Sequence, residues 1–333
     1  MQNLRIKSLR DNILKTQYTD FMFVNQPLEY IYANPNAGID TFIKYYSLEI
    51  GRRSKMAQFI CYRLFSKYGI IINSDNLMSQ FETYTIHPDI LKIIESSEFK
   101  DYFQFLEEKV DIIDNITHPT GVMIDAEGWC RKNGKIEYDE AIWDDGSKHK
   151  VIKKYTPNNP DIVFQPILDH ATLLAEKGKI LYDCIKTLSS EHFLKLKNIY
   201  EASPVLIQQQ SAQSTTQQFT TGGTSILDRV RPTREGLAGC KDTGQDCTLM
   251  IGIFSPYKYA VSIYEGWDLT KLKDYHREIT IMLNRSGKCV TTQMYFNGAN
   301  SYFSELPLLP SYEADKVYNF VEKNRQKELL MNS

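Results

Sequence analysis

The chain has 333 residues, of which 42% are hydrophobic and 24% charged, and its formal net charge is −2. This balance is typical of a globular protein with one large core or two smaller ones, and it excludes disordered and fibrous classes. The net charge excludes a uniformly basic polyanion binder, so any such contact needs a local basic patch.

The longest apolar runs are far shorter than the roughly 18 to 20 residues that cross a bilayer, so no membrane span is expected. The first residues, MQNLRIKSLRDNILKT, lack the continuous apolar stretch of a secretion signal, which favours a cytoplasmic protein. The six cysteines form no CxxC pair, and neither a metal site nor a disulfide framework is expected from them.

The first elements in chain order predict an α/β protein. Apolar spacing predicts a helix from about Ile6 to Val24, ended by Pro27. The β-branched and aromatic residues of Thr41 to Ile50 predict a buried strand, and a 3.6-residue period over Arg52 to Tyr68 predicts a helix after it.

The middle of the chain is expected to be an insertion of helices and a hairpin, residues 74–160, within a single domain of residues 1–333. Ser74 to Ile113 is mostly helical in pattern, and a helix is predicted from about Thr120 to Lys132. The charged stretch Lys135 to Tyr155, with turn formers at its centre, predicts a surface β-hairpin.

The second half repeats the alternation of strand and helix. A strand is predicted within Asp161 to Leu174, a helix over Ile180 to Tyr200 and a strand from Pro204. Near-continuous apolar strands that alternate with helices indicate a parallel sheet covered on both faces. Residues 211–233 are predicted to be a mobile polar loop. Further strands are expected at about 248–254, 278–283 and 290–296, with a final helix at 312–330.

The run REITIMLNRSGK, from Arg277 to Lys288, ends in an Asn-Arg-Ser-Gly turn. This turn would hold Arg285 on a rigid strand end, from which it can reach a phosphate on a neighbouring molecule. The alternative is a turn arginine paired with a surface carboxylate.

These blocks occur in a recognisable order. KYYSLEI, ILDH, PVLIQQQ, GLAGCKDTGQDCTLMIGIF and REITIMLNRSGK together resemble the RecA-like ATPase domain of DnaB-type hexameric replicative helicases, particularly the divergent viral or phage branch. The likeness spans about Lys15 to Pro307. It implies an α/β fold with a RecA-like P-loop NTPase core, a mostly parallel sheet with helices on both faces and an antiparallel C-terminal extension.

The resemblance implies catalytic roles for two carboxylates. Glu49, at the end of the SLE strand, would be the group that activates water for phosphoryl transfer. Asp169, in ILDH, would be the Walker B residue that binds Mg²⁺. The alternatives are a surface carboxylate for Glu49 and a helix N-cap for Asp169. His170 is expected to be structural.

The resemblance also implies a phosphate sensor and a trans-acting cation. Gln210, or Gln209 if the alignment slips by one residue, would sense the terminal phosphate of ATP, although polar strand ends are also common. Arg285 resembles the arginine finger that a neighbouring subunit inserts. Many members carry a lysine two residues before it, whereas this chain has Leu283 there.

The loop from Thr233 to Gly244 corresponds to the family's central-channel loop. Cationic side chains near exposed glycine amides would bind the backbone phosphates of single-stranded DNA, independently of sequence. The candidates are Arg229, Arg231, Arg234 and Lys241. The family's loop arginine is not matched, because Ala238 stands near its place, and a solvated mixed-charge turn is the alternative.

The phosphate-binding loop is incomplete. Lys15 and Thr16 match the end of the family's GKT motif, which implies that both contact ATP and that Thr16 also binds Mg²⁺. Leu9 and Leu14 stand where glycines are needed to let backbone N–H groups approach the phosphates. Either the true loop is encoded upstream, as a separate segment, or it has decayed.

The implied function is that of the ATPase domain, without an intact P-loop, of a DNA helicase that unwinds duplex during replication. It would use ATP and Mg²⁺, translocate on single-stranded DNA and self-associate in a ring, expected to be a hexamer. Activity of the chain alone is expected to be weak. The alternatives are a non-catalytic ring partner that binds nucleotide or DNA, and a decayed remnant. A viral origin would place the protein in the host cytoplasm.

Overall fold

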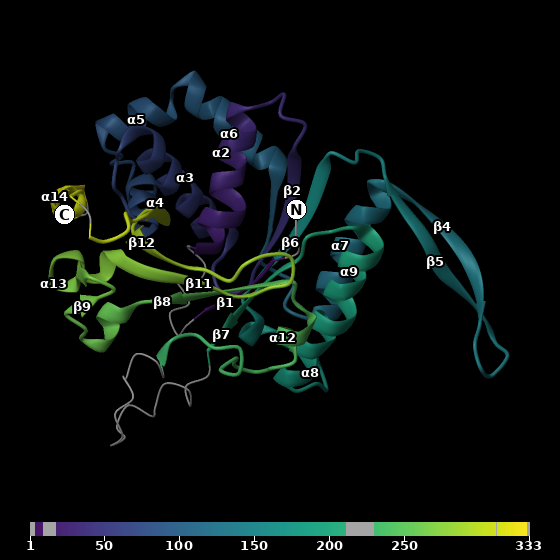
Figure 1. Ribbon diagram of the computed structural model, residues 1–333. Coiled ribbons are helices and arrows are strands. Elements are labelled where there is room, and N and C mark those ends of the chain that lie inside the picture. The colour runs from purple at the N-terminus through teal and green to yellow at the C-terminus, as the bar shows by residue number, and fades with distance from the viewer. Residues whose placement is uncertain (1–3, 9–17, 211–229, 311, 332–333) are drawn as a thin grey trace, which may run out of the picture.

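A central sheet of nine strands organises the molecule (Figure 1). The computed structural model describes residues 4–8, 18–210, 230–310 and 312–331. The strand order is β13-β12-β11-β8-β1-β7-β6-β2-β3. The strand bounds are β1 Leu4–Ser8, β2 Asp40–Ser47, β3 Val110–Ile113, β6 Ile162–Asp169, β7 Val205–Gln209, β8 Leu249–Phe254, β11 His276–Asn284, β12 Thr291–Asn297 and β13 Tyr302–Glu305.

Strands β8, β1, β7, β6, β2 and β3 are parallel, and β11, β12 and β13 add to β8 as an antiparallel extension. The predicted α/β class, with its parallel core and antiparallel C-terminal strands, is confirmed.

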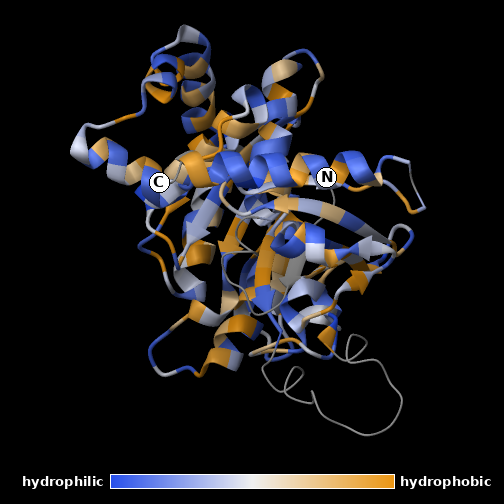
Figure 2. Cartoon of the chain, turned by 90° about the vertical axis from the view of Figure 1, so that its left-hand side faces the viewer, coloured by the Kyte–Doolittle hydropathy of each residue, from blue (hydrophilic) through white to orange (hydrophobic). Residues whose placement is uncertain are grey.

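Helices cover both faces of the sheet (Figure 1). The successive residues Tyr45 and Tyr46 of β2 point to opposite faces and lie in different apolar clusters. The cluster around Tyr45 includes residues of η1, α2, α3 and α6, and the cluster around Tyr46 includes residues of α7, η3 and α9. Apolar residues gather along the central strands between these helices (Figure 2).

The longer helical segments are η1 Asp20–Asn25, α2 Gln26–Ala33, α3 Arg52–Tyr68, α4 Ser74–Thr83, α5 Pro88–Ile94, α6 Ser97–Lys109, α7 Pro119–Lys132, α8 Leu181–Lys186, η3 Thr187–Phe193, α9 Leu194–Tyr200 and α14 Ala314–Met331. The short ones are η2 Ala171–Leu173, α12 Thr243–Asp246, η4 Pro256–Tyr259, α13 Leu269–Leu272 and η5 Lys273–Tyr275. Within these described segments, no helix is long and apolar enough to cross a membrane.

The predicted surface hairpin is confirmed. Strands β4 (Gly134–Ile142) and β5 (Lys148–Pro157) pair with each other and project from the body (Figure 1). Other parts of residues 74–160 belong to the core, because β3 is the edge strand of the main sheet and α7 covers one of its faces. Two short strands, β9 (Ile263–Tyr264) and β10 (Trp267–Asp268), form a separate pair.

The helix predicted from Ile6 to Val24 is wrong at its beginning. Residues Leu4–Ser8 form β1, which pairs with β7 on one side and β8 on the other, and helical structure follows residues 9–17. Residues 9–17, including Lys15 and Thr16, lie outside the described residues, as does most of the predicted polar loop. A strand, a short connection and a helix therefore follow one another where the phosphate-binding loop is expected.

Candidate functional site

Three of the predicted site residues lie at the carboxyl ends of neighbouring parallel strands. Ser47, the last residue of β2, pairs with Asp169, the last residue of β6. Glu49 comes directly after this pair, and Gln210 follows β7, the other neighbour of β6. Ligands in open α/β sheets bind at this edge. The sheet thus brings Glu49, Asp169 and Gln210 to one edge, as predicted.

Glu49 contacts the residue that follows Asp169. Its Oε2 atom lies 3.5 Å from Nε2 of His170, whose side chain is buried, while the Glu49 side chain stays 29% exposed. The other ring nitrogen of His170, Nδ1, lies 2.7 Å from the Thr172 hydroxyl. The imidazole is therefore held from both sides and can orient the Glu49 carboxylate.

Asp169 belongs to a buried charge cluster that sequence reasoning missed. Its Oδ2 atom accepts a hydrogen bond from the Tyr45 hydroxyl at 3.0 Å and lies 3.7 Å from Nζ of Lys55. The Lys55 ammonium also lies 3.2 Å from Oδ2 of Asp20, and the side chains of Lys55 and Asp20 are wholly buried. We call Asp20, Tyr45, Lys55 and Asp169 the buried charge cluster.

The cluster joins elements that are distant in sequence. Asp20 begins η1, Lys55 lies in the first turns of α3, Tyr45 is on β2 and Asp169 ends β6. Lys55 stands four residues before the buried Phe59, on the inner face of its helix. That spacing was a readable signal in the sequence, but lysines are rarely buried unless paired.

Burial sets the protonation behaviour of the cluster. Desolvation raises the pKa of Asp20 to about 6, against the opposing effect of Lys55, and the Asp169 carboxylate raises it further. Desolvation also raises the pKa of Tyr45 well above its usual value, so this phenol remains a hydrogen-bond donor.

The end of β7 is tied to the chain segment expected to contact DNA. The Gln210 side-chain amide donates to the Thr233 carbonyl oxygen at 2.8 Å, and Gln210 bridges to Leu237. The Ala238 N–H donates to the carbonyl oxygen of Gln209 at 2.7 Å.

Gln208 is buried and also binds this segment. Its amide donates to the carbonyl oxygens of Ala238 and Cys240 at 2.6 Å each, and its oxygen accepts from the Thr243 hydroxyl. The segment therefore folds back along the strand end.

The basic residues of this segment differ in their surroundings. Arg231 donates to the Tyr264 hydroxyl and lies 3.1 Å from Glu265 and 3.2 Å from Glu278. Arg234 and Lys241 are exposed, while Arg229 lies outside the described residues. Gly239 is exposed as predicted, but Gly236 is buried and its N–H donates to the Thr233 carbonyl oxygen. Among the described cations, Arg234 and Lys241 thus present the open positive charges of this segment.

Arg285 lies at the opposite edge of the sheet. Its N–H donates to the carbonyl oxygen of Thr248, directly before β8, and β8 runs parallel to the strands that end at the candidate site. The guanidinium donates to the carbonyl oxygens of Gln245 and Cys247, at 2.7 and 3.1 Å, and the residue is exposed. The predicted turn is present, since the Ser286 N–H donates to Oδ1 of Asn284.

Mg²⁺ fits Asp169 only as a single carboxylate. The described residues contain no group of three His, Cys, Asp or Glu side chains that could hold a metal ion. One carboxylate is compatible with Mg²⁺, because this ion keeps several waters and takes other oxygens from substrate phosphates. Thr16, the other expected ligand, lies outside the described residues.

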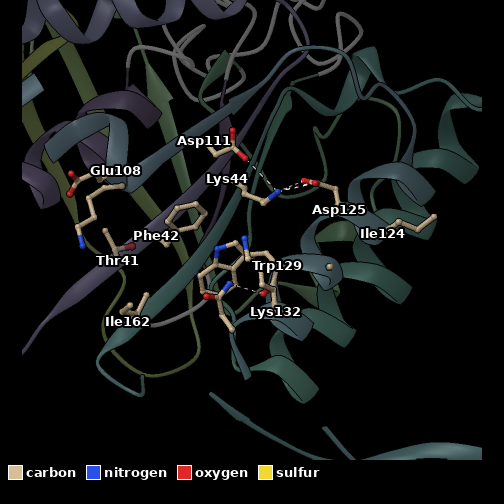
Figure 3. A pocket seen from close by; sticks show the side chains of 13 residues that line it. Thr41, Phe42, Lys44, Glu108, Asp111, Ile124, Asp125, Trp129, Lys132 and Ile162 are labelled. Carbon is tan, nitrogen blue, oxygen red and sulfur yellow. Dashed lines mark hydrogen bonds and ion pairs between the residues drawn. The ribbon is translucent and has the colours of Figure 1, made fainter. Parts of the chain in front are cut away.

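A cavity of about 770 Å³ lies at another place, over β2 and β3 (Figure 3). Thr41 and Ile162 line it, so it faces the amino ends of β2 and β6. Lys44 points into it and is neutralised by Asp125 at 2.7 Å and Asp111 at 3.5 Å. The cavity is therefore separate from the strand ends that hold Glu49 and Asp169.

Comparison with known proteins yields solved structures but no sequence relatives. No model of a known protein family matches the chain, and no curated protein matches it. The chain is similar to a solved structure described as an "ATPase Domain", with a TM-score of 0.58 and 16% identity over 92% of this chain and 85% of that one. The chain has the fold of a DnaB-like helicase ATPase domain.

A second similar structure is "The Structure Of A DnaB-Like Replicative Helicase And Its Interactions With Primase". The TM-score is 0.54 and the identity 15%, over 92% of this chain. The chain spans 59% of the length of that helicase. The likeness therefore concerns the ATPase-domain fold.

Proposed function

We propose that this chain is the ATPase domain of a replicative DNA helicase, which translocates on single-stranded DNA and unwinds duplex as a ring, expected to be a hexamer. The arrangement of the sheet edges carries the proposal. Glu49, Asp169 and Gln210 share the carboxyl edge, whereas Arg285 is exposed at the amino edge. A ring places the amino edge of one copy against the carboxyl edge of the next, which completes the site with Arg285 in trans.

The proposed mechanism assigns separate tasks to these residues. Glu49, oriented by His170, accepts a proton from the attacking water. Gln210 contacts the terminal phosphate of ATP and passes its loss to Thr233, to which it is hydrogen-bonded. Bound Mg²⁺ neutralises phosphate charge, with Asp169 and Thr16 as its protein oxygens. Arg234 and Lys241 bind backbone phosphates of the DNA.

The test uses the chain's own loop sequence. The double substitution Leu9→Gly and Leu14→Gly turns LRDNILKT into GRDNIGKT, which has the GxxxxGKT pattern. We expect weak ATP hydrolysis by the natural chain and clear DNA-stimulated hydrolysis by the Gly variant. The matched control is Leu9→Ala with Leu14→Ala, which keeps a Cβ at both positions and is expected to gain nothing.

Two outcomes would contradict the proposal. Robust hydrolysis by the natural chain would contradict the weak loop, and a correctly folded Gly variant without hydrolysis would contradict the helicase function itself. Adding Glu49→Gln to the Gly variant should abolish its hydrolysis while ATP binding remains.

A non-catalytic ring partner is the second candidate function. The leucines at positions 9 and 14 favour it, because they obstruct the approach of backbone N–H groups to phosphates. In that case the chain binds no ATP, and Arg285→Ala changes the turnover of the catalytic copy with which it assembles.

A further inference from the structure

The buried charge cluster contains one ammonium and two carboxylates. The side chains of Lys55, Asp20 and Asp169 are at most 1% exposed. Removing such charges from water costs several kcal/mol per ion, so their mutual attraction must offset a large desolvation cost. A buried lysine of this kind needs a reason for its presence beyond stability, since an apolar side chain fills a helix interior at lower cost.

The position of Lys55 ties it to the candidate site. Asp169 is the expected metal carboxylate at the end of β6, and α3, which carries Lys55, begins three residues after Glu49. Asp20 stands four residues after Thr16, in the helical segment that follows the expected phosphate-binding loop. Lys55 is thus a cation that contacts both the loop's helix and the metal carboxylate.

We propose that Lys55 is a positioning residue that competes with the divalent cation for Asp169. The inference rests on the proposed function, because it takes Asp169 as the Mg²⁺ carboxylate. In this arrangement the ammonium, 3.7 Å from Oδ2 of Asp169, neutralises the carboxylate before nucleotide and metal bind. A divalent cation at the same carboxylate is repelled by the ammonium and is bound fully only as the Lys55 pair loosens.

Asp20 moderates this competition. It lies closer to Lys55 than Asp169 does, at 3.2 Å against 3.7 Å, and so draws the ammonium away from the metal carboxylate. Tyr45 supports Asp169 from another side through its hydroxyl. The charges of Lys55 and Asp20 therefore act in opposite directions on the affinity of Asp169 for a cation.

The experiment measures Mn²⁺ binding by electron paramagnetic resonance, with the whole chain and without ATP or DNA. Lys55→Met should bind Mn²⁺ at least about tenfold more tightly than the natural chain, because a repelling charge within a few ångströms is removed. Asp20→Asn should bind it more weakly, by about threefold to tenfold, because Lys55 then has Asp169 as its remaining anionic partner in the cluster.

Controls separate charge from packing. Lys55→Arg keeps the charge and should retain the natural affinity within about threefold. Asp169→Asn should abolish the affinity that the other variants change. Circular dichroism identifies any variant that fails to fold, and Asp20→Asn, which keeps the Lys55–Asp169 pair, tests the sign of the effect if Lys55→Met does not fold.

The inference is overturned if Asp20→Asn and every folded Lys55 variant bind Mn²⁺ as the natural chain does, or if the two signs are reversed. It is also overturned if Asp169→Asn leaves Mn²⁺ binding unchanged. These outcomes are independent of ATP hydrolysis. Competition at Asp169 with no hydrolysis in the Gly variant would contradict the helicase function alone.

Discussion

The Gln210 amide donates to the Thr233 carbonyl oxygen across the gap between a strand end and the following segment, at 2.8 Å. Strand β7 ends at the candidate nucleotide site, and Thr233 begins the segment expected to contact DNA. A change in the position of Gln210 must therefore shift that segment. The link is direct, because the amide of one residue binds the backbone of the other.

Gly236 makes this link possible. A Cβ at position 236 would lie 1.8 Å from the Gln210 side-chain oxygen. We expect Gly236→Ala to lower the free energy of unfolding by about 1 to 3 kcal/mol, because the segment must move away from Gln210. Gly128→Ala is the matched control, since nothing lies within 4 Å of its Cβ position and it occupies the interior of α7. Urea denaturation should show that control to be more stable by about 0.5 to 1 kcal/mol. Equal effects of both substitutions would contradict the close packing at Gly236.

Lys55→Met is expected to destabilise the protein by about 3 to 5 kcal/mol, because two buried carboxylates lose their cation. Lys67→Met in the same helix removes an exposed lysine that lies 3.2 Å from Glu98, and should cost less than about 1 kcal/mol. The measurement is urea denaturation of both variants at neutral pH. Similar losses in the two variants would contradict the burial of the Lys55 pair.

Asp20 should make stability fall as pH rises. Its folded pKa of about 6 exceeds its ordinary value of 3.8, so between these values the folded state keeps a proton that the unfolded state has lost. The free energy of unfolding should therefore decrease by about 2 to 3 kcal/mol between pH 4 and pH 7 through this group alone. Asp20→Asn removes the effect, so the stability of the natural chain relative to this variant isolates it. A difference that stays constant or grows with pH would contradict the raised pKa.

Arg285 should act on the neighbouring copy. In the Leu9→Gly, Leu14→Gly background, Glu49→Gln and Arg285→Ala are each expected to abolish ATP hydrolysis. Mixing the two variants should restore part of it, because some sites then combine Glu49 of one copy with Arg285 of the next. The readout is phosphate release as a function of the mixing ratio, with each variant alone as control. If no ratio restores hydrolysis although the copies assemble, Arg285 does not act in trans.

The sequence predicted the strands and helices with strong local patterns. Helix α3 has the predicted bounds of Arg52 and Tyr68, and β2, β6 and β7 lie within or close to their predicted ranges. Strand β1 was misread because its five residues, LRIKS, run into apolar residues with helical spacing. Its strand conformation depends on pairing with β7 and β8, which are distant in sequence.

The candidate site was predictable to the extent that family blocks mark strand ends. Glu49, Asp169 and Gln210 were found because each ends a predicted strand. Lys55, Asp20 and Tyr45 were not, because their importance depends on a charge arrangement that appears only when η1 meets α3 and β6. The contacts of Arg231 with Tyr264, Glu265 and Glu278 were equally invisible, since they join residues from three separate segments.

The central place of β1 has a consequence for how the chain folds. Its register joins Ile6 to Ile207 on one side and to Ile251 on the other, so each pairing closes a loop of about two hundred residues or more. Within the described strands β7 and β8 do not pair with each other, so the two halves of the sheet meet through β1. During synthesis this strand emerges long before either partner, and its edges stay uncovered until β7 and β8 have followed. Such non-local topology is expected to fold slowly and to expose this strand to aggregation or to chaperones in the meantime.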